Sequence, residues 1–208
     1  MGNIGTKTKS LIFYFLAGIA KIIYLLYTAT IETRTVIINS KYRPRELPEN
    51  FNAIYAFWHS KLFMIMPMGK NARIGVLTLL DWKNFFYDKL CRLFGYHTIP
   101  LTNDSIAARK LKELIDDGFS VGLAVDGPRG PSGVVRPGTV YLAKKTKRPI
   151  ITIDIKFDNS IRLWRRWDKF EIPLPFTKTI ITLGEPIYVD GKSVEEVTSE
   201  LKKKLGDH

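Results

Sequence analysis

NAIYAFWHS, residues 52–60, is an almost unbroken apolar run that ends on a histidine. An apolar run of this length is typical of a strand covered on both faces, as the strands of parallel sheets are. Similar runs recur along the chain, and segments with helical patterns separate them. This alternation predicts an α/β fold, with a mainly parallel sheet flanked by helices. The expected strands are RTVIIN (34–39), NAIYAFW (52–58), IGVLTLL (74–80), YHTIPL (96–101), the start of SVGLAVDGPRGP (120–131), RPIITIDIKF (148–157), and KFEI (169–172) and TIITLGEPIYV (179–189), which close the sheet.

Signals at helix ends place the helices. NFFYDKLCRLFG (84–95) stops at a glycine, and Asn103 or Asp104 caps a helix that runs to Asp117. PGTVYLAKKTK (137–147) begins with a proline in its first turn. SVEE (193–196) is a capping box that opens a final charged helix.

The composition fits one domain with an appendage. The chain has 208 residues, 45% of them hydrophobic, and a formal net charge of +12. Such a charge attracts nucleic acid, anionic lipid or acidic proteins, and it does not choose among them. Cys91 is the only cysteine, so an intramolecular disulfide is excluded and a reducing compartment is favoured. Its place inside a helix predicts a buried and unreactive thiol.

The N-terminal segment is apolar enough to meet a membrane. Residues 11–31 are mostly apolar and are interrupted only by Lys21. The length reaches the roughly 17–25 residues that a spanning helix needs, although a charge at mid-span is costly there. A signal peptide and a core helix are further alternatives. We favour a helix or bent helix pair in the membrane interface, with Lys21 reaching the head groups. The predicted division is a membrane-associating segment at 1–33 and an α/β domain at 34–208.

Three polar features follow three different strands. His59 ends the first, Asp81 ends the second, and Asp126 opens the turn DGPRG (126–130) after the third. Ligands gather at the carboxyl ends of such strands, so these residues are expected to converge. Neutral imidazole is a natural general base, and a carboxylate could orient it. In the turn, Gly127, Pro128 and Gly130 allow close backbone approach, and Arg129 offers a fork for phosphate or carboxylate.

Each feature also has a structural interpretation. The histidine could be satisfied by packing, Asp81 could cap a helix, and the turn could be only a tight loop. No metal-ligand spacing is recognisable, although a magnesium site on Asp81 and Asp126 is an alternative. RLWRRW (162–167), which interleaves arginine with tryptophan, suits a membrane interface, a phosphate-bearing ligand or single-stranded nucleic acid.

Four stretches together resemble one enzyme superfamily. They are FWHSKLFMIMP, GYHTIPLTNDS, LAVDGPRGPSGVVRPGTVYLAKKTKRPI and WDKFEIPLPFTKTIITLGEPI, and they span roughly residues 50–190. They are similar to the lysophospholipid-acyltransferase superfamily. More narrowly, they resemble its compact bacterial branch, long labelled a domain of unknown function, which is akin to the late (secondary) acyltransferases of lipid A biosynthesis.

The resemblance implies acyl transfer from an acyl thioester, carried by acyl carrier protein or coenzyme A, to a lipid hydroxyl at the cytoplasmic face of the bacterial inner membrane. His59 matches the superfamily's histidine, but Met64 stands where its aspartate is expected. Asp81 is therefore expected to orient His59, with Asp126 in reserve. Arg129, helped by Lys61, is expected to hold a phosphate. No cofactor is expected, and the expected partners are a lipid acceptor, an acyl carrier protein and the anionic membrane surface.

Other functions remain open on the sequence. A lysophospholipid or glycerophospholipid acyltransferase would use the same site. A non-catalytic protein that binds anionic lipid would explain Met64. A magnesium phosphohydrolase and a nucleic-acid binder are the remaining alternatives, and we expect no nucleic-acid partner because no familiar motif is present.

Overall fold

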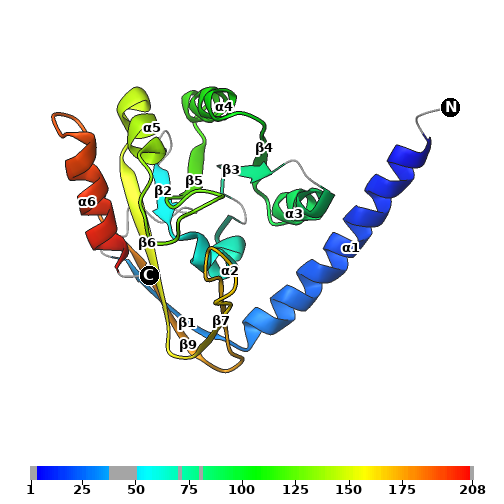
Figure 1. Ribbon diagram of the computed structural model, residues 1–208. Coiled ribbons are helices and arrows are strands. Elements are labelled where there is room, and N and C mark those ends of the chain that lie inside the picture. The colour runs from blue at the N-terminus through cyan, green and yellow to red at the C-terminus, as the bar shows by residue number, and fades with distance from the viewer. Residues whose placement is uncertain (1–3, 38–50, 70–71, 80–81, 207–208) are drawn as a thin grey trace.

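The computed structural model describes residues 4–37, 51–69, 72–79 and 82–206. A seven-stranded sheet in the order β1-β9-β6-β2-β5-β3-β4 forms its centre (Figure 1). Neighbouring strands are parallel except for β6 and β9, so the prediction of a mainly parallel sheet flanked by helices is confirmed. The strands are β1 (Glu32–Ile37), β2 (Ile54–Phe57), β3 (Ile74–Leu79), β4 (His97–Leu101), β5 (Ser120–Ala124), β6 (Ile150–Phe157) and β9 (Lys178–Leu183).

Helices cover both faces of the sheet because alternate side chains of each strand point to opposite sides. In β2, Ile54 and Ala56 pack in one cluster with side chains of α4, α5 and α6. Tyr55 and Phe57 pack in a second cluster with Met64 and Ile65 on the other face. The helices are α1 (Ile4–Ala29), α2 (Leu62–Ile65), α3 (Trp82–Leu93), α4 (Asp104–Asp116), α5 (Gly138–Thr146) and α6 (Val194–Leu205).

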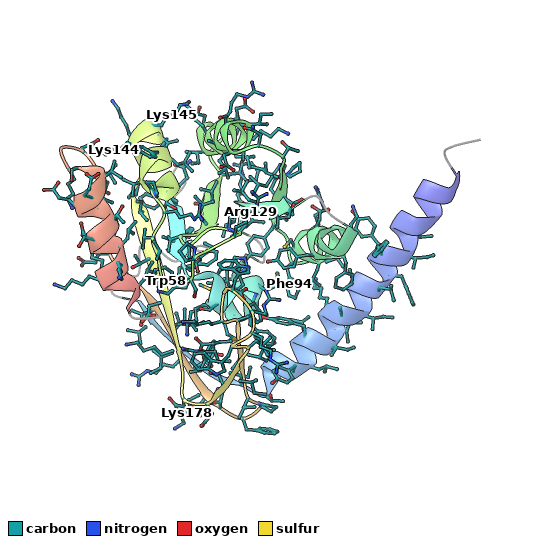
Figure 2. All side chains as sticks on the ribbon, viewed as in Figure 1. Trp58, Phe94, Arg129, Lys144, Lys145 and Lys178 are labelled. Carbon is teal, nitrogen blue, oxygen red and sulfur yellow. The ribbon has the colours of Figure 1, made fainter. Side chains whose placement is uncertain are left out.

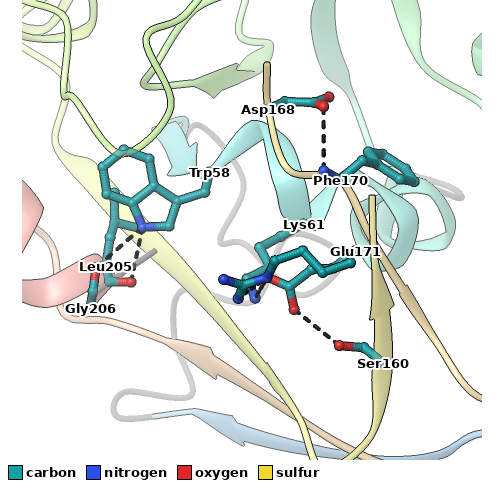
Figure 3. A network of polar contacts seen from close by, with 9 residues as sticks. Trp58, Lys61, Ser160, Asp168, Phe170, Glu171, Leu205 and Gly206 are labelled. Atoms are coloured by element: carbon teal, nitrogen blue, oxygen red, sulfur yellow. Dashed lines mark hydrogen bonds and ion pairs between the residues drawn. The ribbon is translucent and has the colours of Figure 1, made fainter. Parts of the chain in front are cut away.

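The expected caps are present. Asn103 accepts a hydrogen bond from the backbone N–H of Ser105 at the start of α4. Ser193 and Glu196 form the capping box of α6. At the other end of α6, the indole N–H of Trp58 contacts the carbonyl oxygens of Leu205 and Gly206, at 3.2 and 3.3 Å (Figure 3). The residue before His59 is therefore held by the end of the last described helix.

One predicted strand is not part of the main sheet. The segment predicted as KFEI (169–172) forms β8 (Glu171–Pro173), which pairs antiparallel with β7 (Ser160–Arg162) in a separate two-stranded sheet. We call residues 160–173 the β7–β8 hairpin. Its loop lies beside α2 in front of the sheet (Figure 1). The prediction was wrong because the local pattern of a strand does not reveal which sheet the strand joins.

Helix α1 leaves most of its surface uncovered. Residues Leu11–Ala29 have a mean hydropathy of 1.9, and this stretch is long and apolar enough to cross a membrane. Only 6% of it is buried. Lys21 does not reach outward as expected. Its Nζ donates to the carbonyl oxygen of Leu93 at 2.6 Å and lies 5.3 Å from the centre of the Phe94 ring. A cation at the C-terminal end of α3 satisfies a carbonyl that the helix leaves open, which explains the charge in this apolar helix.

Candidate active site

His59 lies where strand β2 ends and a short 3-10 turn, His59–Lys61, begins. Its backbone N–H donates to Oδ1 of Asp126 at 3.0 Å. Asp126 follows β5, which is the parallel neighbour of β2. The expected convergence of these two residues at one edge of the sheet is therefore confirmed. Asp126, however, contacts the His59 backbone rather than the ring for which it was the reserve candidate.

The ring contact comes from Asp168, in the loop of the β7–β8 hairpin. Nδ1 of His59 lies 2.9 Å from Oδ2 of Asp168, whose side chain is fully buried. Arg166 donates two hydrogen bonds to the same carboxylate, from Nε to Oδ1 at 2.9 Å and from Nη2 to Oδ2 at 2.8 Å. The backbone N–H of Phe170 adds a third contact at 3.3 Å (Figure 3). A carboxylate with this many donors is fixed in position.

The surroundings set the charge of the pair. Burial favours the neutral form of Asp168, but hydrogen bonds and charge from Arg166 and His59 outweigh it and hold the pKa of the carboxyl below its usual range. Burial lowers the pKa of His59, while Asp168 opposes that effect. At neutral pH the pair is therefore an ionised carboxylate and a neutral imidazole. The carboxylate assigns the proton to Nδ1, which leaves the lone pair of Nε2 open to accept a proton.

Trp167 packs against the histidine. The two ring centres are 4.9 Å apart, and the ring planes are inclined by 54°. Trp167 also lies close to Gly130, where an added Cβ would be 2.6 Å from the indole ring. Gly130 also has a φ of +70°, which disfavours other residues. A side chain at Gly130 would therefore displace Trp167 from its present position beside His59.

His59 lines an apolar cavity of about 590 Å³. His59, Arg166, Trp167 and Phe170 line it together with Gly127 and Pro128 of the turn. The volume falls within the range of roughly 300–1,000 Å³ that is usual for small-molecule sites. Its remaining lining is almost entirely apolar or aromatic and comes from α1, from α2 and α3, and from residues in or beside β2, β3, β4 and β5: Tyr24, Phe57, Leu62, Phe63, Ile65, Met66, Val76, Leu77, Thr78, Leu79, Tyr87, Leu90, Cys91, Tyr96, Leu101, Gly122, Leu123 and Ala124.

The other expected ligand-binding residues lie away from this lining. Arg129 is exposed on the turn after β5 (Figure 2), and neither Arg129 nor Gly130 is among the described residues that line the cavity. Lys61 is buried, and its Nζ forms an ion pair with Oε1 of Glu171 at 2.7 Å. The expectation that Lys61 helps to hold a phosphate does not fit this geometry, because its charge is already compensated within the protein.

Asp81, the first candidate for orienting His59, lies outside the described residues, and its role stays a prediction. Among the residues that the structure describes, no group of three or more His, Cys, Asp or Glu side chains is placed to hold a metal ion. Cys91 is buried as expected, and burial raises the pKa of its thiol to about 12.

Sequence reasoning missed Asp168, Arg166 and Trp167 as members of the site. The sequence pattern places them in a basic aromatic loop, whereas a carboxylate for His59 is expected at the end of a strand. Asp168 is 109 residues from His59 and does not end a strand of the main sheet. The available signal was an acid beside Trp167 within a stretch of cations, in one of the segments that carry the family resemblance.

Comparisons with known proteins place the fold. No family model matches the chain. The chain is 28% identical over 166 residues to an uncharacterized protein of Rickettsia prowazekii (strain Madrid E), an alignment that covers 72% of this chain and 75% of the relative. It is also similar to the crystal structure of the 1-acyl-sn-glycerophosphate (LPA) acyltransferase PlsC from Thermotoga maritima, with a TM-score of 0.56 and 18% identity, over 100% of this chain and 86% of that one. The chain therefore has the fold of this acyltransferase structure.

Proposed function

We propose that the protein is a membrane-associated O-acyltransferase that moves a fatty acyl chain from a thioester to a lipid hydroxyl. The observation that carries the proposal is the His59–Asp168 pair, whose histidine lines an apolar cavity. The pair supplies a general base with an oriented imidazole. The cavity offers a dry site for a hydrocarbon chain next to that base. The fold, shared with a protein whose title names it an LPA acyltransferase, supports the same reaction class.

The reaction follows from the position of Nε2 on His59. Nε2 takes the proton of the acceptor hydroxyl while the oxygen attacks the carbonyl carbon of the thioester. Asp168 stabilises the imidazolium that forms. The tetrahedral intermediate then collapses, the C–S bond breaks, and the imidazolium returns its proton to the leaving thiolate. The N–H groups of Arg166 that do not bind Asp168 are available at the cavity for the oxyanion, and such donors contribute about 3–4 kcal/mol each.

The position of Asp168 beside His59 weakens the case for a non-catalytic lipid-binding protein. That alternative depended on Met64, which replaces the aspartate expected five positions after His59. Met64 is buried in α2 and packs in the core. Asp168 supplies the missing carboxylate from the β7–β8 hairpin, so the site keeps a base and its orienting acid.

We assign the membrane as the second partner. Lys21, Tyr24 and Tyr27 hold one face of α1 on the domain, through bonds to the carbonyl oxygens of Leu93, Phe63 and Pro173. These bonds hold the C-terminal part of α1, and a helix held on one face is suited to lie in the interface of a bilayer with its opposite face among the lipid chains. That face carries exposed Leu11, Ile12, Phe15, Leu16, Ile19, Ile22, Ile23, Leu25 and Leu26. The proposed location is the cytoplasmic face of the bacterial inner membrane.

The proposed acceptor is a lipid A precursor, so that the reaction is a secondary acylation in lipopolysaccharide biosynthesis. A lysophospholipid is the alternative acceptor, and it is the one named for the solved neighbour. Acyl carrier protein and coenzyme A are both candidate carriers of the acyl chain. The net charge of +12 suits an acidic carrier protein as well as anionic lipid.

Two measurements test the proposal. Purified protein is given an acyl thioester and either a lipid A precursor or a lysophospholipid, and thiol release is followed with and without each acceptor. His59→Gln should abolish acceptor-dependent release while leaving vesicle binding intact. Mass spectrometry of lipids from a deletion strain should show lipid A that lacks one acyl chain. Parental transfer by His59→Gln would refute the general base, and acceptor-independent or absent thiol release would refute the reaction class.

A further inference from the structure

The β7–β8 hairpin brings Asp168, Arg166 and Trp167 to His59, yet none of these residues belongs to the main sheet. The position of the site therefore depends on what holds the hairpin. Its two strands pair only over Ser160–Arg162 and Glu171–Pro173. A short two-stranded ribbon has little stability of its own, so its anchoring must come from contacts with the domain.

A second ion pair supplies such a contact. Nζ of Lys61 lies 2.7 Å from Oε1 of Glu171, and the two side chains are only 10% and 4% exposed. Lys61 is two residues after His59, and Glu171 is three residues after Asp168. The two pairs therefore join the same two segments at neighbouring points. Two contacts between the same two segments restrict both sliding of the hairpin along the turn that carries His59 and rotation about it.

The hairpin itself keeps Glu171 in place. Arg162, on the facing strand, donates from Nη2 to Oε1 of Glu171 at 2.9 Å, and the hydroxyl of Ser160 contacts Oε2 at 3.3 Å. Lys61 also lies 5.0 Å from the centre of the Phe157 ring. Figure 3 shows the carboxylate of Glu171 between Lys61 and Ser160, with Asp168 and Phe170 at the neighbouring turn. Moving the hairpin away from Lys61 would leave both buried charges without their partners. The ion pair therefore favours the position of the hairpin in which the contact is made.

We infer that Lys61 and Glu171 are positioning residues, which hold Asp168 against Nδ1 of His59 without contacting substrate. The inference rests on the proposed function, because orientation of His59 matters only if His59 is the base. The contacts themselves are present without substrate. It gives Lys61 a different role from phosphate binding. It also separates two effects that an activity assay would mix, namely loss of the base and loss of its orientation.

The test measures the imidazole directly. Protein with ¹⁵N-labelled histidine is prepared in detergent micelles, and the resonances of His59 are assigned by their loss in His59→Gln. The parent should show one Nδ1–H tautomer with slow solvent exchange of that proton. Glu171→Gln and Lys61→Met should each speed that exchange about tenfold or more and admit the Nε2–H tautomer, because the hairpin opens more often. Lys61→Arg, which keeps the charge, should restore most of the protection.

The matched control is Glu200→Gln on α6, which breaks a half-buried ion pair with Lys192, outside the β7–β8 hairpin and the turn of His59, and should leave His59 unchanged. Should Glu171→Gln not fold, Arg162→Met removes only the outer contact and should give a smaller change in the same direction. An unchanged tautomer and exchange rate in folded Glu171→Gln or Lys61→Met would overturn the inference. Because no acyl transfer is measured, this outcome is independent of whether the proposed reaction is correct.

Discussion

Replacing Asp168 by asparagine tests the central contact of the site. The change keeps the size of the side chain and removes the charge that faces Nδ1 of His59 at 2.9 Å. Two unit charges at that distance interact by about 6 kcal/mol at an effective dielectric constant of about 20. The positive charge of Arg166, bound to the same carboxylate, opposes the imidazolium and removes part of this. About 4 kcal/mol of transition-state stabilisation remains, which corresponds to roughly a thousandfold in kcat.

The same variant should remain folded. Arg166 loses its carboxylate partner, but its side chain is 51% exposed and can be solvated instead. The introduced amide could also donate to Nδ1 and hold the wrong tautomer, which adds to the loss of activity. The assay is acceptor-dependent thiol release from an acyl thioester, with Glu200→Gln as the control and thermal unfolding as the check on folding. If Asp168→Asn retains kcat within tenfold of the parent, Asp168 does not orient the base, and Asp81 becomes the candidate again.

Three further predictions follow from other parts of the structure. Burial raises the pKa of Asp126 to about 6, above its unfolded value, so this carboxyl lowers stability increasingly as the pH rises from about 4 to 6, and in full above that. Asp126→Asn should therefore raise the free energy of unfolding by up to about 3 kcal/mol at pH 8, and the gain should vanish as the pH falls through 6 towards 4. Urea titrations measure this, and a gain that does not change with pH would contradict it. Cys91→Phe places a ring in the cavity lining, so a chain that loses three methylene contacts should bind roughly fiftyfold more weakly and products should be shorter by mass spectrometry. An unaltered product profile would mean that the chain lies elsewhere. Lys21→Met should cost only about 0.3–1 kcal/mol of stability and leave vesicle binding intact, whereas serine at both Ile22 and Ile23 should release the protein from vesicles in flotation assays. Release by the Lys21 variant alone would place that residue at the lipid surface.

The fold could be predicted from sequence because its strands are long apolar runs. A parallel strand that is covered on both faces carries that signal in its own residues, as β2 does from Ile54 to Phe57. The same rule located His59 and Asp126, since each lies two residues after the end of such a strand. Helix ends could also be predicted, because Asn103 and Ser193 act on residues two or three positions away.

The remainder depends on contacts between distant segments. The pairing of His59 with Asp168 joins residues 109 positions apart, and neither residue's neighbours reveal it. The partner of Lys61 is 110 positions away, so an isolated lysine beside a histidine looked like a ligand for phosphate. Lys21 looked like a cation for head groups because the C-terminus of α3, which it contacts, is 72 residues further on. In each case the polar group was noticed and its partner was not.

The hydrogen bonds of the Trp58 indole can form only late in the synthesis of the chain. Its partners, the carbonyl groups of Leu205 and Gly206, are made 147 and 148 residues later. At about 5–20 residues per second, the ribosome needs roughly 7–30 s to reach them after it has passed the histidine. Helix α1 emerges long before that and can settle on lipid while the domain behind it is incomplete. Under the proposed function, a nascent chain would reach the membrane before the contact that holds the residue next to His59 can form.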